Sequence, residues 1–270
     1  MLDNAERREN HAWWTAQRGA SPVVGTAIHD GHAVRPNLLL KMALDEDERL
    51  QEEDPFTAET VRDLANHIVV HRSRFEVDLN RARDGAVYLR PEQAWGLQVW
   101  QEQPSEAEVA EVLSLHDAYY EMLEGYLRGV EAQYGRFVVL DVHSYNHRRA
   151  GPAAPPTAAN EAPEVNIGTF SMDRSRWMPV VEAFMAFAAD FDFFGRRLDV
   201  RENVAFQGRG EQTRFIHERF PKNGCAIAVE FKKIFMDEWT GVPDRQALAA
   251  LRSLMAASVP VLERALREVA

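Results

Sequence analysis

Residues 137–144 read FVVLDVHS, an apolar and β-branched run that passes into polar residues. The part from Phe137 to Val142 is of buried-strand type and predicts an interior strand that ends on His143. Side chains two residues apart along a strand point to the same face, so Asp141 and His143 are expected to project together. The run therefore predicts a buried strand that brings a carboxylate and an imidazole to one side of a sheet.

Strand-like and helical segments alternate on both sides of this run. Further strands are expected over residues 23–28, 68–71, 75–79 and 225–231. Helices are expected over residues 2–18, within an N-terminal helical segment 1–20, and over 36–50, 57–66 with Thr57 as N-cap, 105–134, 174–189 and 245–268. This alternation predicts one α/β domain over residues 1–270, with a mixed, mostly parallel central sheet flanked by helices.

One segment is too poor in large apolar groups to join a core. Residues 150–163 read AGPAAPPTAANEAP and predict a flexible loop. The loop follows the strand that ends on His143, at the place where a site is expected. A mobile lid and a plain surface excursion are both open interpretations of it.

The composition limits the partners and the kind of metal site. The chain has 270 residues, a net charge of −11 and a single cysteine, Cys225. One cysteine excludes an internal disulfide and a multi-cysteine zinc site, so His, Asp or Glu must supply any ligands. The negative charge argues against nucleic acid, yet a small anionic substrate can still bind where a few arginines converge. The oligomeric state stays open.

The sequence also bears on where the protein works. No apolar stretch is long enough to cross a membrane. The charged N-terminus lacks the apolar core of a signal peptide. We therefore expect a cytoplasmic protein with no membrane partner.

Polar residues gather at three expected strand ends, where open α/β sheets place their ligand sites. They are His29 to His32, Asp141 to Ser144, and Glu230. Imidazole suits zinc, and a catalytic zinc takes three protein ligands and a water. His29 and His32 could both reach one ion if the turn between them curls back. Asp141 could orient His143 as a hydrogen-bond partner. We expect one divalent ion per chain, Zn²⁺ first among the candidates.

Glu230 lies among apolar neighbours in AIAVEF, residues 226–231. Burial raises the pKa of a carboxyl toward the range that a general base needs, which makes Glu230 a candidate catalytic residue. The alternative is an edge strand with Glu230 facing water, or an ion pair with Lys232 or Arg214.

Asn80 and Arg81 follow the strand expected over residues 75–79. Arginine offers a rigid bidentate fork for a carboxylate, and asparagine adds directional hydrogen bonds. The pair is therefore a candidate for binding an anionic substrate, although arginine is most often a solvated surface residue.

Taken in order, these clusters resemble those of the N-formylglutamate amidohydrolase family, which is related in fold to zinc carboxypeptidases and to aspartoacylase. The resemblance runs from about Ser21 to Glu238. Its most specific pieces are VDLNR at residues 77–81, LDVHS at 140–144, NIGTF at 166–170 and VEFKKIFMDE at 229–238. It implies a zinc-carboxypeptidase-like fold and a zinc-dependent amidohydrolase.

The resemblance also implies roles for single residues. His29 and His143 match metal ligands, and the third ligand is either Asp54 or His32. Glu230 matches the catalytic glutamate. Asn80 and Arg81 match the pair that binds a substrate carboxylate or polarises the scissile carbonyl. For a second anionic group the candidates are Arg214 and Arg209.

The expected activity is hydrolysis of the amide of an N-acyl acidic amino acid, with N-formyl-L-glutamate favoured. Departures from the family pattern lie around the pocket: HDGHAVRP at residues 29–36, and GRGEQ at 208–212. These leave open a deacylase or carboxypeptidase-like hydrolase of another N-acyl amino acid or peptide. A catalytically silent binding or regulatory protein on the same fold is the other alternative. We find neither a Gly-x-Gly-x-x-Gly motif nor a Gly-x-Ser-x-Gly elbow.

Overall fold

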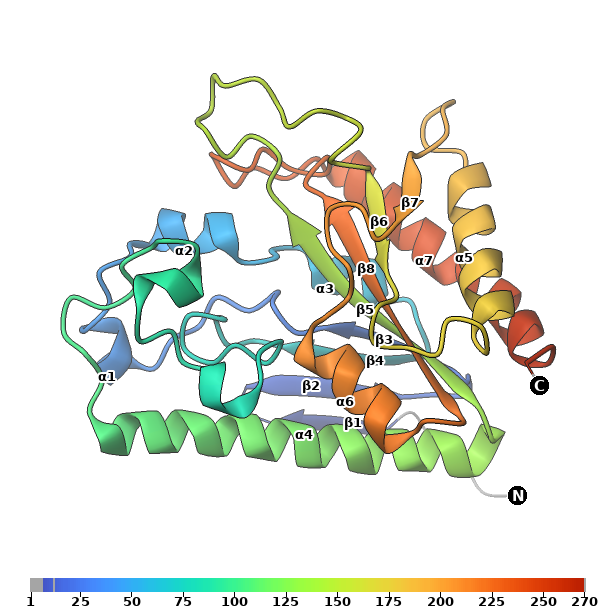
Figure 1. The fold of residues 1–270 in the computed structure, drawn as a ribbon, viewed down its shortest axis with the longest axis horizontal. Helices are drawn as coiled ribbons and strands as arrows, with labels where there is room; N and C mark the ends of the chain where they lie inside the picture. The colour runs from blue at the N-terminus through green and yellow to red at the C-terminus, as the bar shows by residue number, and fades with distance from the viewer. Residues whose placement is uncertain (1–6, 12, 270) are drawn as a thin grey trace.

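A computed structural model describes residues 7–11 and 13–269. Within these residues eight strands form one sheet in the order β1-β2-β4-β3-β5-β8-β6-β7 (Figure 1). The strands are β1 (Arg7–His11), β2 (Trp14–Arg18), β3 (Val23–Ala27), β4 (Asn66–Val70), β5 (Phe137–Tyr145), β6 (Val165–Gly168), β7 (Val200–Glu202) and β8 (Gly224–Lys232). The helices are α1 (Pro36–Leu39), α2 (Glu46–Glu52), α3 (Thr57–Val61), α4 (Glu106–Tyr134), α5 (Met178–Asp190), α6 (Glu211–Arg219) and α7 (Arg245–Leu266). Two short 3-10 helices lie at Arg83–Gly85 and Pro91–Ala94.

The centre of the sheet is parallel. β5 lies between β3 and β8 and is parallel to both, and β4 is parallel to β3. Antiparallel pairs join β1 to β2, β2 to β4 and β6 to β8, while β7 is parallel to β6. All nine residues of β5 are buried, as expected of a strand that is covered on both faces. The predicted α/β domain with a mixed, mostly parallel sheet is confirmed.

Alternate residues of β5 enter two apolar clusters on opposite faces of the sheet. Val138, Leu140 and Val142 join the cluster that contains α5 and α7, whereas Phe137 and Val139 join the cluster that contains α4. Asp141 and His143 continue this second series, so both lie on the α4 face, as the alternation predicted. Figure 1 shows α4 along the lower side of the sheet, α6 just above α4 in this view, and α5 and α7 on the right.

The predicted N-terminal helix within residues 1–20 is wrong where the structure describes the chain. Residues 7–11 and 14–18 are strands, and β2 pairs antiparallel with β4, Trp14 opposite Val70. Trp13 and Trp14 pack against each other and against Tyr119 of α4, with ring centroids 4.3 and 6.4 Å apart. This segment is a strand because its backbone pairs with β4, some 50 residues away in the sequence. The local periodicity of the sequence does not reveal such a pairing. Residues 2–6 and 12 of the predicted helix lie outside the described residues.

Two further predicted helices are shorter than expected. The helix over 36–50 is interrupted because the Ala43 N–H bonds the Val99 carbonyl at 2.8 Å, and Asp45 then opens α2 with a capping box. The helix over 57–66 is reduced to α3, because Asn66 already begins β4. Phe56, at φ 68°, occupies the N-cap position in place of Thr57, whose hydroxyl donates to the Asp54 carbonyl at 2.7 Å.

Residues 75–79 form turns instead of the predicted strand. The N–H groups of Glu76 and Val77 both bond back to the Ser73 carbonyl, at 3.0 and 3.2 Å. The Glu76 carboxylate is buried between Arg35 and Arg72, at 2.7 and 3.1 Å. A buried carboxylate needs such partners, and satisfying it here outweighs the strand preference of the apolar neighbours.

The remaining elements follow the sequence closely. The strands expected at 23–28, 68–71 and 225–231 are β3, β4 and β8, and the helices expected at 105–134, 174–189 and 245–268 are α4, α5 and α7. The short elements β6, β7 and α6 were not expected. Residues 150–163, all described, form neither helix nor strand, while their role as a lid stays a prediction. None of the helices in the described part of the chain is long and apolar enough to span a bilayer.

His217 fastens α6 to the sheet. Its Nε2 accepts the N–H of Ala226 in β8 at 2.9 Å, where β6 no longer pairs with that strand. Nδ1 must then carry the ring proton, and it lies 3.0 Å from the Ser171 hydroxyl. Burial lowers the pKa of His217 to about 4. Protonation would remove the acceptor that the Ala226 N–H needs, so α6 docks with a neutral imidazole.

This neutral histidine makes stability depend on pH. The unfolded chain binds a proton at His217 below its ordinary pKa of 6.5, whereas the folded chain does so only near pH 4. Stability is therefore lost as pH falls between these values, by about 2 kcal/mol from pH 8 to pH 5. In His217→Gln, whose amide oxygen can accept the same N–H without titrating, we expect this part of the loss to disappear. Urea unfolding of both proteins at the two pH values measures it, and equal losses would show that His217 is not the cause.

Candidate active site

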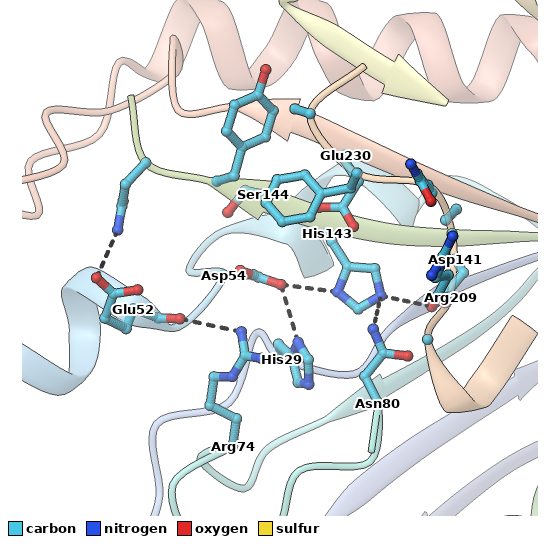
Figure 2. Close-up of a pocket in the computed structure, with 18 of the residues that line it drawn as sticks. His29, Glu52, Asp54, Arg74, Asn80, Asp141, His143, Ser144, Arg209 and Glu230 are labelled. Carbon is cyan, nitrogen blue, oxygen red and sulfur yellow. Dashed lines mark hydrogen bonds and ion pairs between the residues drawn. The ribbon is translucent and has the colours of Figure 1, made fainter. Parts of the chain in front are cut away.

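A cavity of about 450 Å³ opens at the carboxyl ends of β3, β5 and β8 (Figure 2). This is the edge at which parallel sheets of α/β proteins bind ligands. Its polar lining comes from segments far apart in the chain: His29 after β3, Asp54 between α2 and α3, Asn80 and Arg81 after β4, His143 in β5 and Glu230 in β8. The loop from Val204 to Gly210, between β7 and α6, forms a further wall.

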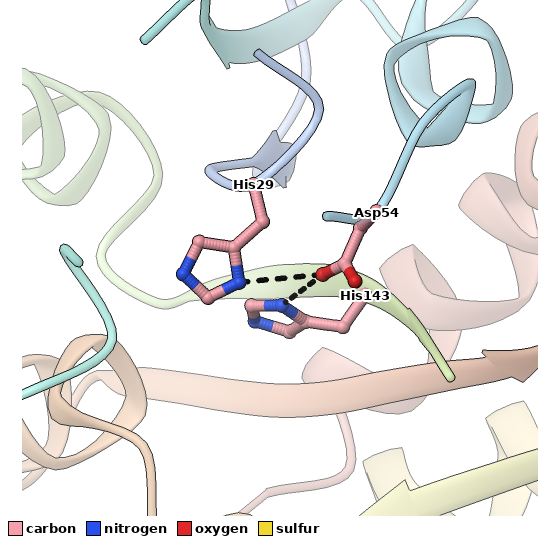
Figure 3. Close-up of side chains that lie close together, drawn as sticks. All are labelled: His29, Asp54 and His143. Carbon is pink, nitrogen blue, oxygen red and sulfur yellow. Dashed lines mark hydrogen bonds and ion pairs between the residues drawn. The ribbon is translucent and has the colours of Figure 1, made fainter. Parts of the chain in front are cut away.

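His29, Asp54 and His143 converge within this cavity (Figure 3). Asp54 Oδ2 lies 3.3 Å from His29 Nδ1 and 3.0 Å from His143 Nδ1. All three side chains are buried, and their ligand atoms lie within 4.8 Å of one another. The Asp54 N–H bonds the His29 carbonyl at 3.0 Å, which fixes the loop between α2 and α3 against the end of β3.

A second carboxylate lies next to Nε2 of His143, the ring nitrogen that points away from Asp54. Nε2 of His143 is 3.2 Å from Asp141 Oδ1, on the same face of β5, as the alternation predicted. Thr26 and Gln212 hold that oxygen from the other side, with donor distances of 3.1 and 2.5 Å. Asp141 thereby sets the orientation of the His143 ring.

His29 is held in the same way by Asp78. Nε2 of His29 is 2.8 Å from Asp78 Oδ1, and the other oxygen of Asp78 accepts from Arg74 at 3.1 Å and from the Tyr88 hydroxyl. Burial raises the pKa of Asp78, but Arg74 and His29 outweigh burial and hold it well below its usual range. Asp78 is therefore a charged acceptor in a dry environment.

This set of donors fits a divalent cation. The carboxylates behind both rings favour a proton on each Nε2, which leaves both Nδ1 lone pairs facing Asp54. Three electron-rich atoms then point at one another, an arrangement that a cation stabilises. Without an ion the same contacts call for a doubly protonated His143: burial lowers the pKa of His143, yet Asp141 and Asp54 outweigh burial and raise that pKa well above its usual range.

His32, the other candidate for third ligand, points elsewhere. Its Nδ1 lies 2.5 Å from Glu53 Oε2, and its Nε2 accepts from Arg49 at 3.1 Å. Glu53 also accepts from the Ser73 hydroxyl. His32 thus supports the residue next to Asp54, and the structure brings Asp54 rather than His32 to His29 and His143.

Glu230 faces the same cavity from the neighbouring strand. It lies in register with His143 across the β5–β8 pair, and with Asn166 across the β8–β6 pair, so its strand is interior and not an edge. Burial raises the pKa of Glu230 to about 7; His143 opposes the shift, and Asp54 and Asp141 add to it. The ion pairs considered from the sequence do not form, since Lys232 donates to the Ala162 carbonyl and Arg214 binds Glu211.

Asn80 and Arg81 lie at the mouth of the cavity. The Asn80 amide nitrogen is 3.4 Å from His143 Nε2, and within the described residues its buried Oδ1 has no hydrogen-bond partner. The backbone of Gly210 packs on this amide so closely that a Cβ there would lie 2.1 Å from Oδ1. Arg81 is half-exposed, with Nε 3.8 Å from Asp78.

Arg209 and Arg214, the two other arginines predicted to bind an anionic group, lie in different parts of the structure. Arg209 lines the cavity and stacks on Phe170, 3.9 Å from the ring centroid. Arg214 lies on the outer side of α6, where it pairs with Glu211 at 2.5 Å and with Glu218, and it lines a different surface depression. The structure therefore places Arg209, and not Arg214, in the cavity that holds His29, Asp54 and His143.

Sequence reasoning missed two cations in the lining, Arg74, which is largely buried, and Lys233, which is fully buried. Lys233 Nζ donates to the carbonyls of Gln51 and Glu53, at 2.5 and 2.9 Å, and so anchors the loop that carries Asp54. Burial lowers the pKa of Lys233 to about 8. The only available signal was position: Arg74 stands four residues before Asp78, and Lys233 three after Glu230.

Comparisons with known proteins found a matching family model and solved structures of similar fold. A family model described as N-formylglutamate amidohydrolase matches residues 21–236. The structure of an N-formylglutamate amidohydrolase from Ralstonia eutropha JMP134 is 14% identical and superposes with a TM-score of 0.72, covering 96% of this chain and 98% of that one. A gene product of Agrobacterium tumefaciens is 17% identical with a TM-score of 0.60, covering 91% and 93%. At these identities the structures show a shared fold.

No curated protein matches the sequence. The family model, by contrast, covers most of the chain and spans His29, Asp54 and His143 together with Glu230. On that match, the chain belongs to the N-formylglutamate amidohydrolase family.

Proposed function

We propose that this protein is a zinc-dependent hydrolase of the amide bond in an N-acylated acidic amino acid. The observation that carries the proposal is the convergence of His29, Asp54 and His143 with Glu230 in one cavity. N-formyl-L-glutamate, after which the family is named, is the first substrate to test. The products would be formate and L-glutamate.

The zinc ion would be held by His29, His143 and Asp54. Two imidazoles and a carboxylate are ligands that zinc accepts, and three protein ligands leave a position open for water or substrate. When bound, the ion lowers the pKa of a water ligand to about 7 and polarises the acyl carbonyl.

Glu230 acts as the base. Its carboxylate takes one proton of the attacking water while the water oxygen bonds to the acyl carbon. The same proton then passes to the amide nitrogen as the C–N bond breaks, which releases an amine and a carboxylic acid. A pKa raised by burial to about 7 suits both halves of this transfer.

In this proposal the arginines of the cavity bind the negatively charged groups of the substrate. Arg81 is half-exposed and beside Asn80, so it can meet a substrate carboxylate as a bidentate fork. Arg209 is a second candidate for an anionic group. Arg74, held by Asp78 and by its stacking on Trp95 at 4.8 Å, can contribute a fixed positive charge next to the reacting carbonyl.

The first test combines metal content with turnover. We expect wild-type protein to contain about one zinc per chain and to release glutamate from N-formyl-L-glutamate. His143→Ala should lose both, because it removes a ligand. Elemental analysis and an assay of released glutamate measure the two properties. Protein that binds no metal and turns over no N-acyl substrate, even with zinc supplied, would replace this proposal with a binding or regulatory role.

A second test separates the base from the ligands. In Glu230→Gln we expect the zinc content to stay at the wild-type level and kcat to fall by about 10²- to 10⁴-fold, since only proton transfer is lost. Glu182→Gln, on the exposed face of α5, is the matched control and should leave both unchanged. Full activity in Glu230→Gln would remove it from the mechanism.

A third test identifies the third ligand. Asp54→Ala should lose zinc, because the carboxylate oxygen that faces both imidazoles is gone. His32→Ala should keep the ion, since that ring contacts Glu53 and Arg49. Metal analysis after dialysis of both variants decides between them, and the reverse pattern would assign the ligand to His32.

A further inference from the structure

The cavity continues from the reacting groups to an apolar wall formed by Tyr145, Val204 and Phe206. Phe206 and Tyr145 meet edge to face, with ring centroids 5.3 Å apart. Tyr145 is almost fully buried, whereas Val204 and Phe206 are 40% and 41% exposed. Single exposed apolar residues are ordinary, but here they gather on one side of a catalytic cavity.

The loop that carries this wall is fixed through its backbone. Asn166, fully buried in β6, accepts the N–H groups of Val204 and Ala205, both at 2.9 Å, and donates to the Phe206 carbonyl at 2.7 Å. Gly208, at φ +75°, packs on Gly168 so closely that a Cβ would lie 2.5 Å from the Gly168 carbonyl carbon. The wall is therefore preformed, and an apolar ligand loses little order by packing on it.

The wall and the anion-binding residues lie on opposite sides of the reacting groups. Asn80 reaches His143 near Asp141, and Gly210 packs on that amide. Tyr145 stands two residues beyond His143 along β5, a step of about 7 Å. The loop between β7 and α6 connects the same two places, with Phe206 at Tyr145 and Gly210 at Asn80. A substrate with its carboxylate at Asn80 and Arg81 and its amide at His143 and Glu230 directs its acyl group toward the wall.

The size of this end does not suit a formyl group, and its charges do not suit an anionic acyl group. A formyl group has a single carbon and leaves the wall uncovered. Arg149, which lines the cavity four residues after Tyr145, is already paired with Glu52 through two contacts of 3.2 Å. An apolar acyl group of several carbons covers the exposed faces of Val204 and Phe206 without disturbing that pair.

We propose that the preferred substrate carries an apolar acyl group of several carbons, bound by Tyr145, Val204 and Phe206. This inference rests on the proposed amide hydrolysis and specifies which part of the substrate the enzyme selects. The reaction is unchanged: water adds to the acyl carbon, the C–N bond breaks, and a longer carboxylic acid leaves in place of formate.

The test uses a series in which the reactivity of the amide stays nearly constant. N-acetyl-, N-butanoyl- and N-hexanoyl-L-glutamate differ only in chain length. Each buried methylene should raise kcat/KM by about 4-fold, so hexanoyl, with four more methylenes, should exceed acetyl by about 250-fold. In Phe206→Ala we expect this gradient to fall to about 10-fold or less, with the acetyl substrate almost unaffected.

The matched control is Phe194→Ala, a phenylalanine that is 60% exposed and lies outside the cavity lining. It should keep the full gradient. Binding gives a second readout: calorimetry with zinc-loaded Glu230→Gln should show tighter binding of hexanoyl- than of acetyl-L-glutamate, and adding Phe206→Ala should remove that difference.

The outcomes separate the two proposals. Hydrolysis of the whole series with a flat or falling gradient overturns the acyl wall and leaves the amide hydrolysis standing. A gradient that survives in Phe206→Ala also overturns the assignment of the wall. If zinc-loaded protein hydrolyses N-formyl-L-glutamate but no member of the series, the acyl wall is overturned and the amide hydrolysis stands. If it hydrolyses neither, the proposed reaction fails, and equal affinity of Glu230→Gln for acetyl- and hexanoyl-L-glutamate then overturns the wall as well.

Discussion

The in-register pairing of β5 with β8 is the constraint on which the site depends. It sets His143 beside Glu230 at adjacent positions of two buried strands, so their separation follows from backbone hydrogen bonds rather than from side-chain packing. β3, on the other side of β5, ends just before His29. His143 and Glu230 thus lie on neighbouring strands and His29 just after a third, while Asp54 comes from the loop between α2 and α3.

The buried carboxylates around this cluster each have partners of their own. Asp78 and Asp141 face the far nitrogens of the two histidines, and each is itself held by other groups, Arg74 and Tyr88 for one, Thr26 and Gln212 for the other. Such outer partners fix the rings and raise their strength as donors. A substitution at Gln212 on α6 would therefore reach the site through Asp141, although its own side chain lies outside the cavity lining.

Much of the centre was predictable because its signals are local. The apolar run of β5, the alternation of Asp141 with His143, and the capping of α4 by Ser105 can all be read within a few residues. The N-terminal strands could not, because β2 exists through its pairing with β4. For the same reason the sequence left Asp54 and His32 as equals, and suggested Arg214. Which way a side chain turns at the end of a loop depends on partners such as Glu53 for His32 and Glu211 for Arg214, and spacing does not reveal them.

The attachment of the loop after β7 has a consequence for how such a protein can diverge. The Asn166 side chain forms hydrogen bonds with main-chain atoms of residues 204, 205 and 206. The close contact of Gly168 with Gly208 is likewise between main-chain atoms. The path of the loop is therefore held mainly through its main chain, and the side chains at these three positions contribute less. They can be exchanged one by one while the ligands, the base and the strand register stay as they are. Proteins that descend from one ancestor can in this way acquire different substrate preferences while their catalytic residues stay unchanged.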